Sequence, residues 1–213
     1  MPKAPTVGIQ NEWDIVGGLS KPSKMPSYGY SIPAKYCNVG GKLRLVEGST
    51  CSHCYALKGR YVFPNVAECL ERRYESLQDP RWVESMAHII NTLGLEFFRW
   101  HDAGDVQSVE HLQMIVSVAL LTPNTKHWLP TREYRIVKDW QTTNTIPGNL
   151  TIRLSAHMVD TTPSSGYGLP TSTVIKATTP DTFVCNAKAR GGKCGPCRAC
   201  WSPKVANVAY PIH

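Results

Sequence analysis

Four cysteines in the last quarter of the chain have a spacing that suits a metal cluster. Cys194, Cys197 and Cys200 follow one another as C-x2-C-x2-C, and Cys185 precedes them with eight residues between. Overlapping C-x2-C pairs can place three thiolates on one side of a 4Fe-4S cluster while the remote cysteine binds the other side. A structural zinc site more often joins two separated C-x2-C pairs into a tetrahedron. The spacing therefore favours a 4Fe-4S cluster, and zinc remains the alternative.

A second group of three cysteines lies near the start of the chain. Cys37, Cys51 and Cys54 could bind three irons of a cubane and leave the fourth iron open to a small molecule, which lets a cluster do chemistry as well as carry an electron. The sequence allows either one cluster shared by both groups or two separate clusters. Cys69 stands outside both groups in a helical stretch, where a small buried hydrophobic residue is the favoured interpretation.

Length and composition limit the class of protein. A chain of 213 residues predicts a single domain, 1–213, with a core of ordinary size. Its start lacks a secretory pattern, and the longest apolar run, 114–121, is too short to span a membrane, so we expect a cytoplasmic protein, in the host cytoplasm if it is phage-encoded. Eight cysteines in a reducing compartment indicate metal ligands before disulfides.

The charge balance favours anionic partners. The formal net charge is +7, from 23 basic and 16 acidic side chains, so nucleic acid is one candidate partner. Some of this charge could instead offset the negative charge of a cluster, because basic residues surround the last cysteines. These residues are Lys188, Arg190, Lys193 and Arg198.

Hydrophobic periodicity predicts strands alternating with helices. Residues 1–35 are rich in Pro, Gly and Ser and predict an irregular arm, 36–184 a β/α body, and 185–213 a cysteine-rich tail ordered by its metal. Strands that alternate with helices form parallel β/α units, which close toward a barrel or wind doubly around a sheet. We expect a partial or small TIM-like (β/α) barrel. The predicted helices cover 66–77, 82–93 and 109–120, a polar segment runs to residue 140, and the predicted strands cover 95–100, 126–130, 149–155, 172–177 and 182–185.

Polar side chains follow directly after these predicted strands. The carboxyl ends of parallel strands meet at one edge of a sheet, where functional groups gather. We therefore expect a functional site there, with Asp102, Asp105, Arg132 and Glu133 as candidate catalytic residues. The residues that follow the strands are His101, Asp102, Asp105, Thr131, Arg132, Glu133, Ser155, His157 and Cys185.

Each of these residues also has a structural interpretation. Asp105 or Ser108 could cap the next helix, Arg132 and Glu133 could form a solvated ion pair, and His157 could be an ordinary loop histidine. Because strand-end loops usually face solvent, we expect substitutions here to change ligand binding more than stability.

Several motifs together resemble a known family. CSHCYA, RWHDAGD, WLPTRE and a final C-x2-C-x2-C-W, within 36–201, are similar to a family of largely uncharacterised bacteriophage proteins that are distant relatives of the radical-SAM superfamily. The resemblance implies that Cys37, Cys51 and Cys54 hold the cluster that binds S-adenosylmethionine (SAM). It also implies that the final four cysteines hold an auxiliary cluster. The superfamily usually spaces its cysteines C-x3-C-x2-C, whereas here the first gap is 13 residues.

The same resemblance implies a cofactor-binding edge. The loop after the first predicted long strand would lie near the methionine amino group of SAM. Together with the strand-end serine, the predicted cofactor-binding residues are His101, Asp102, Gly104, Asp105 and Ser155.

Three functions compete at this point. The first is an iron-sulfur enzyme that cleaves SAM reductively and uses the radical on a small-molecule substrate. The second is a non-catalytic cluster protein that accepts electrons from a donor or senses redox state. The third is a zinc-containing nucleic-acid-binding protein. The basic charge favours this function, but a whole β/α body with polar strand ends matches it poorly.

Overall fold

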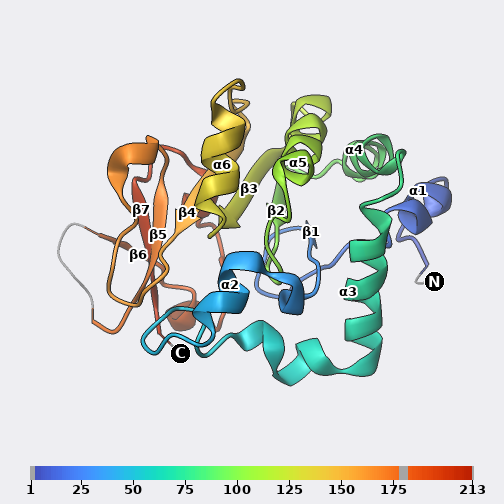
Figure 1. Ribbon diagram of the computed structural model, residues 1–213. Coiled ribbons are helices and arrows are strands. Elements are labelled where there is room, and N and C mark those ends of the chain that lie inside the picture. The colour runs from blue at the N-terminus through green and yellow to red at the C-terminus, as the bar shows by residue number, and fades with distance from the viewer. Residues whose placement is uncertain (1–2, 178–181, 213) are drawn as a thin grey trace.

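A single parallel sheet runs through the protein. The computed structural model describes residues 3–177 and 182–212, and its seven strands lie in the order β1-β2-β3-β4-β5-β7-β6, with every neighbouring pair parallel (Figure 1). Parallel neighbours need crossover connections, and helices supply several of them. The strands are β1 (Gly29–Tyr30), β2 (Phe97–Trp100), β3 (Lys126–Thr131), β4 (Leu150–Ser155), β5 (Thr171–Ile175), β6 (Phe183–Val184) and β7 (Asn207–Pro211).

The helices begin where the sequence offers start signals. Ser108 caps α5, because its hydroxyl accepts a hydrogen bond from the His111 amide at 3.1 Å, and Pro64 occupies the first turn of α3. The α-helices are α1 (Gln10–Ile15), α2 (Asn38–Leu43), α3 (Pro64–Ser76), α4 (Trp82–Thr92), α5 (Val109–Leu121) and α6 (Tyr134–Gln141). The short 3-10 helices are η1 (Ala34–Tyr36), η2 (Tyr55–Leu57), η3 (Gly59–Val62), η4 (Ser165–Tyr167), η5 (Lys188–Arg190) and η6 (Ala199–Trp201).

One face of the sheet, here called the helix face, packs against the helices. Successive side chains of a strand point to opposite faces, so alternate residues of β2, β3 and β4 enter the main core with side chains of α1, α4, α5 and α6. Figure 1 shows α4, α5 and α6 along this side of the sheet. The strand residues of this core are Tyr30 of β1 together with Phe98, Trp100, Leu129, Leu150, Ile152 and Leu154.

The opposite face, here called the tail face, is covered by irregular chain. Phe97 and Trp128 pack edge-on against Trp201, with ring centroids 5.5 and 5.2 Å apart, and Met25 from the N-terminal region joins them. A doubly wound sheet would carry helices on both faces, whereas the main core here packs its α-helices against one face. The structure is therefore a mixed α/β fold built on one parallel sheet, and its closure toward a small barrel stays a prediction. Within 3–177 and 182–212, no pairing joins the edge strands β1 and β6.

The secondary structure agrees with the prediction in the middle of the chain and departs from it toward the two ends. All five expected strands and all three expected helices form, while the polar segment before residue 140 is the helix α6. The expectation of a merely irregular arm over 1–35 is wrong, because this region supplies α1 and β1. Ile9 and Tyr30 are fully buried, and Trp13 is 5% exposed. The tail also contributes β7 to the sheet.

No helix in the described part of the chain is both long and apolar enough to cross a membrane.

Candidate functional site

The first cysteine group gathers around the start of α2. Cys37 directly precedes this helix, and Gly40 in its first turn leaves room for the sulfurs. A Cβ on Gly40 would lie 3.5 Å from Cys51 Sγ and 3.8 Å from Cys37 Sγ, so both sulfurs lie within 4 Å of one point. Burial raises the pKa of the Cys37 thiol most, and nearby Asp105, Cys54 and Cys51 raise it further. The three thiols are therefore close enough to interact.

Arg132 is a positively charged residue that acts on the thiols of this group. Its charge lowers the pKa of both Cys37 and Cys51 and so opposes the effect of burial, which raises them. Its Nε donates to Thr50 Oγ1 at 2.9 Å and to the Ala156 carbonyl at 3.3 Å. Arg132 therefore holds the residue next to Cys51 and favours the thiolate forms that bind metal.

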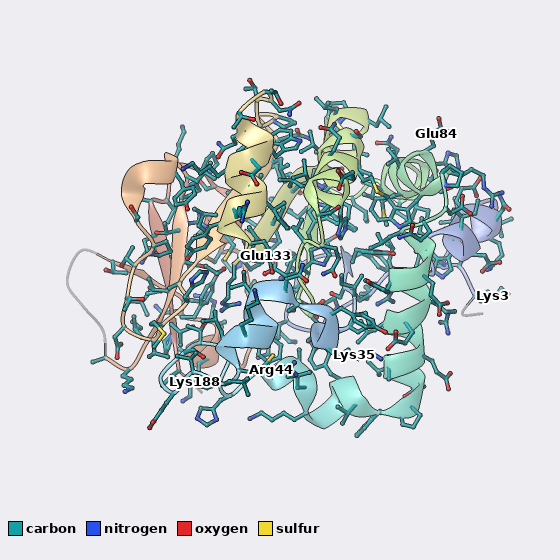
Figure 2. The ribbon with its side chains drawn as sticks, viewed as in Figure 1. Lys3, Lys35, Arg44, Glu84, Glu133 and Lys188 are labelled. Carbon is teal, nitrogen blue, oxygen red and sulfur yellow. The ribbon has the colours of Figure 1, made fainter. Side chains whose placement is uncertain are left out.

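Glu133 holds the other side of the cysteine loop. It precedes α6, and its Oε1 accepts a hydrogen bond from the Val39 amide at 2.8 Å, at the N-terminus of α2 (Figure 2). A carboxylate is favourable there because the first amides of a helix lack intrahelical partners. Glu133 and Arg132 do not form an ion pair with each other among the described residues, so the interpretation of a solvated pair is wrong.

Asp102 ties the loop that follows β2 to the cysteine segment. Its Oδ2 accepts from the Tyr61 hydroxyl at 2.8 Å, its Oδ1 accepts from the Ser31 hydroxyl, and its carbonyl accepts from the Tyr55 hydroxyl at 2.5 Å. Tyr55 follows Cys54 directly. The carboxylate thus positions the aromatic residues beside the cysteine group.

Asp105 is buried, and its hydrogen bonds connect the loop after β2 to the end of β3. It accepts hydrogen bonds from the Val106 amide at 2.8 Å, the Thr131 hydroxyl at 2.6 Å and the Arg132 amide at 2.9 Å. Burial raises the pKa of Asp105, and these hydrogen bonds oppose the rise. Asp105 is 5% exposed and Glu133 is 4% exposed, so the expectation that both face solvent is wrong. Asp105 also does not cap α5, since Ser108 does.

The remaining predicted cofactor residues make structural contacts as well. Gly104 has φ +81°, and a Cβ there would lie 2.4 Å from Ile32 Cγ1. His101 is 4% exposed with φ 56°, neither ring nitrogen has a hydrogen-bond partner, and burial lowers its pKa far below the usual range. The Ser155 hydroxyl lies 3.0 Å from that of Ser172. A catalytic or cofactor-binding role for this set, and for Asp102, Asp105, Arg132 and Glu133, stays a prediction.

His157 contacts residues that position the first cysteine group. Its ring stacks on Tyr134 with centroids 4.3 Å apart, and its Nε2 lies 3.1 Å from the Arg132 carbonyl. Its own carbonyl accepts from the Thr50 amide at 2.9 Å. His157 therefore packs within the fold and helps to place the loop that carries Cys51.

The second cysteine group lies between β6, β7 and the tail. Cys185 follows β6 and donates its amide to Ala209 of β7 at 2.8 Å, while the Cys194 amide donates to the Lys24 carbonyl at 3.0 Å. Burial raises the pKa of the Cys194 thiol, and Cys185 and Cys197 raise it further. The fold therefore places Cys185 near enough to Cys194 and Cys197 for these thiols to interact, and their role as metal ligands stays a prediction.

Cys200 faces a tyrosine of the sheet. Its Sγ lies 3.2 Å from the hydroxyl of Tyr210, on β7. Burial raises the pKa of Cys200 to about 11, while the hydrogen bond to Tyr210 and the charges of Arg153 and Arg99 lower it. A cavity of about 230 Å³ opens beside this pair. It is lined by Lys24, Cys185, Ala187, Lys188, Gly192, Tyr210 and Pro211.

Two arginines on the tail face were not identified as functional residues from the sequence. Arg153 is fully buried and donates to the carbonyls of Thr171, Val205, Ala199 and Ser202 at 2.8, 3.0, 3.2 and 3.0 Å. These bonds hold the tail against the sheet. The detectable signal was a charged residue in the middle of the apolar strand LTIRLS.

Arg99 is the second such arginine, in the strand FFRW. Its guanidinium lies 4.5 Å from the centre of the Trp128 ring, and its Nη1 lies 3.9 Å from Met25 Sδ. Among the described residues no carboxylate lies within ion-pair distance of Arg99 or Arg153. Two positive charges therefore stand near the tail cysteines without an ion pair to any described residue, although the charge of Asp102 also acts on Arg99.

All eight cysteines lie in the described ranges, and all are free thiols. Within those ranges no three or more His, Cys, Asp or Glu side chains are placed as ligands of one metal ion. Cys69 is half-buried, outside both groups, and its Sγ accepts from Arg72 Nη2 at 3.0 Å. The expectation of a fully buried residue there is therefore only partly met.

Comparison with known proteins gives one match. The model of the family described as gene product 88 matches residues 6–203, which include both cysteine groups. No curated protein and no solved structure matches the chain.

Proposed function

The chain belongs to the gene product 88 family, a family of phage-type gene products, and for this member we propose an iron-sulfur protein that binds a 4Fe-4S cluster at each of its two cysteine groups. The observation that carries the proposal is the clustering of thiols. Cys37 and Cys51 lie beside Gly40, and Cys37 and Cys54 pack against the same small apolar cluster. Cys185 lies near enough to Cys194 and Cys200 for its charge to act on both.

The residues of the first group fit a cluster. All three donors are soft thiols, the ligand type that iron-sulfur clusters prefer. Cys37 Sγ and Cys51 Sγ both lie beside Gly40, where an added Cβ would approach Cys37 Cβ to 3.1 Å. Arg132 offsets part of the negative charge that thiolates would bring into this partly buried place.

The residues of the second group fit as well. The cavity of about 230 Å³ has Cys185 in its wall together with Tyr210, whose hydroxyl contacts Cys200. This volume is below the roughly 300–1,000 Å³ of pockets for drug-sized ligands, and it suits a compact inorganic group. Arg99 and Arg153 supply positive charge there.

A bound cluster would supply one-electron transfer, and at a three-cysteine site also an iron without a protein ligand. The chain's own residues would prepare that site. Cys37, Cys51 and Cys54 bind the metal, while Asp102 positions the Tyr55 and Tyr61 rings beside it. Kinship with radical-SAM enzymes would make SAM the small molecule at this edge of the sheet.

Electron transfer without SAM chemistry is the second candidate. The four cysteines of the tail would satisfy all four irons of a cubane, which is the arrangement of a cluster that only carries electrons. This observation favours a redox function for the tail group whatever the first group does.

The direct test is metal analysis of anaerobically purified protein. We expect about eight irons and eight sulfides per chain, and about half of each in Cys51→Ala or Cys197→Ala, because each variant removes a ligand from one group. Cys69→Ala is the matched control and should keep the full content. Stoichiometric zinc with no labile sulfide would refute the proposal.

The proposal that SAM reacts at the first cysteine group has its own test. Electron paramagnetic resonance of the reduced protein should change when SAM is added, and dithionite should yield 5′-deoxyadenosine. Cys51→Ala should lose both effects, and Cys197→Ala should keep the spectral change. An unchanged spectrum in fully loaded protein would favour the electron-transfer candidate.

A further inference from the structure

The tail cysteines have neighbours that no cysteine pattern predicts. Tyr210 is the only side chain other than a thiol that the described structure places in hydrogen-bond contact with Cys200. It projects from β7, opposite Val174 of β5, onto the tail face. Both residues pack against an apolar cluster that includes Phe97 and Trp128, with Met25 beside them.

This hydrogen bond has a definite direction when the cysteine binds metal. A metal-bound cysteine is a thiolate and has no proton to donate, whereas a phenol is neutral at pH 7 and can donate. The Tyr210 hydroxyl therefore donates to Cys200 Sγ in the loaded protein. Apolar neighbours lower the local dielectric constant and so strengthen such a bond.

Arg99 adds a positive charge to the same place. Its guanidinium lies 4.5 Å from the centre of the Trp128 ring, and its Nε has no hydrogen-bond partner in the described part of the chain. Its Nη1 lies 3.9 Å from Met25 Sδ, and the same sulfur lies 4.0 Å from Cys194 Sγ. The charge of Asp102 also acts on Arg99, although no ion pair joins these two described residues. Four thiolates with a 4Fe-4S core would add further negative charge on the tail side of this guanidinium.

Resting on the proposed function, we propose that Tyr210 and Arg99 are positioning residues of the tail cluster that raise its reduction potential. Reduction adds one electron and makes the cluster more negative. A hydrogen bond to a ligand sulfur and a nearby positive charge both stabilise the more negative form. Each residue therefore shifts the one-electron midpoint potential upward.

The test is a redox titration of the tail cluster in the full chain, with dithionite as reductant and electron paramagnetic resonance as readout. Every protein compared also carries Cys51→Ala and Cys54→Ala, so that the tail cluster is the cluster titrated. We expect Tyr210→Phe to keep iron and sulfide and to titrate at a more negative potential. Tyr74→Phe, on α3 and outside both cysteine groups, is the matched control and should not shift.

Arg99→Gln provides a second variant and should shift the potential in the same direction. In the unsubstituted tail, an exchangeable proton coupled to the cluster should be visible by pulsed resonance in water and lost in deuterium oxide. Unchanged potentials in fully loaded Tyr210→Phe and Arg99→Gln would overturn this inference and leave the proposed function intact. Absence of iron and sulfide from the unsubstituted protein would overturn both.

Discussion

Gly104 allows two chain segments to touch at the strand ends. Its φ is +81°, and an added Cβ would lie 2.4 Å from Ile32 Cγ1 and 2.7 Å from the Ile32 carbonyl oxygen. We expect Gly104→Ala to lower the free energy of unfolding by about 1–3 kcal/mol, measured by urea denaturation, because strain and overlap add. Gly148→Ala, with nothing within 4 Å, should change it by less than about 0.5 kcal/mol. Equal losses would show that the close approach is not what matters.

Two buried histidines should make the protein sensitive to acid. Burial lowers the pKa of His111 to about 4 and that of His127 to about 3, from the ordinary 6.5. A lowered pKa means that the unfolded chain takes up protons first, so stability is full above pH 6.5 and is lost as the pH falls toward 4 and then 3. The loss is on the order of 3 kcal/mol for each histidine.

The measurement is the free energy of unfolding between pH 7 and pH 4 in His127→Gln. Glutamine does not titrate and can still donate to Thr122 Oγ1, which lies 2.8 Å from His127 Nε2. We expect a smaller decrease with acid than in the unsubstituted protein. His88→Gln, at an exposed position of α4, is the control and should keep the original slope. An unchanged slope in His127→Gln would contradict the prediction.

At the scale of elements, β4 orders the tail through Arg153. Its guanidinium satisfies four carbonyls, three of them in the segment 199–205. We expect Arg153→Lys to keep the charge but lose most of these bonds, with at least about 2 kcal/mol of destabilisation and faster proteolysis after residue 190. Arg135→Lys, whose side chain is 93% exposed, is the matched control. Native protease resistance of the tail in Arg153→Lys would refute this role.

The tail need not depend on metal alone for its order. Trp201 packs between Phe97 and Trp128, and its indole donates to the Phe98 carbonyl at 2.9 Å. These contacts are made by the protein itself. A metal-free protein should therefore keep the segment around η6 against the sheet, while the loop that carries Cys194 and Cys197 depends more on its ligand bonds.

At the scale of the whole molecule, the N-terminal region is part of the packed core and of the sheet. Ile9, Trp13 and Tyr30 lie in the main core, and β1 pairs with β2. Deletion of residues 1–30 should therefore abolish cooperative urea unfolding and the near-ultraviolet circular dichroism of the buried tryptophans. Deletion of 1–3 is the control and should preserve both. A cooperative, soluble product of the longer deletion would show that this region is only an accessory arm.

The sequence by itself determined the features that depend on neighbours along the chain. Cysteine spacing identified the two groups, and hydrophobic periodicity predicted the strands from β2 to β6 and the helices α3, α4 and α5, because a helix or strand repeats its buried side chains at a local period. Short elements with little periodicity, such as β1 and α2, were missed for the same reason. The nature of the metal remains a prediction from thiol chemistry.

Only the tertiary structure decided which partners these residues have. Glu133 binds the Val39 amide 94 residues away, and Arg153 binds the Val205 carbonyl 52 residues away. Such contacts arise when strands from distant parts of the chain align in one sheet, and no local pattern encodes their register. Asp105 was therefore predicted to be a solvent-facing ligand, whereas it is buried and hydrogen-bonded within the fold. Tyr210 was not identified from the sequence, because only its position on β7 places it next to Cys200.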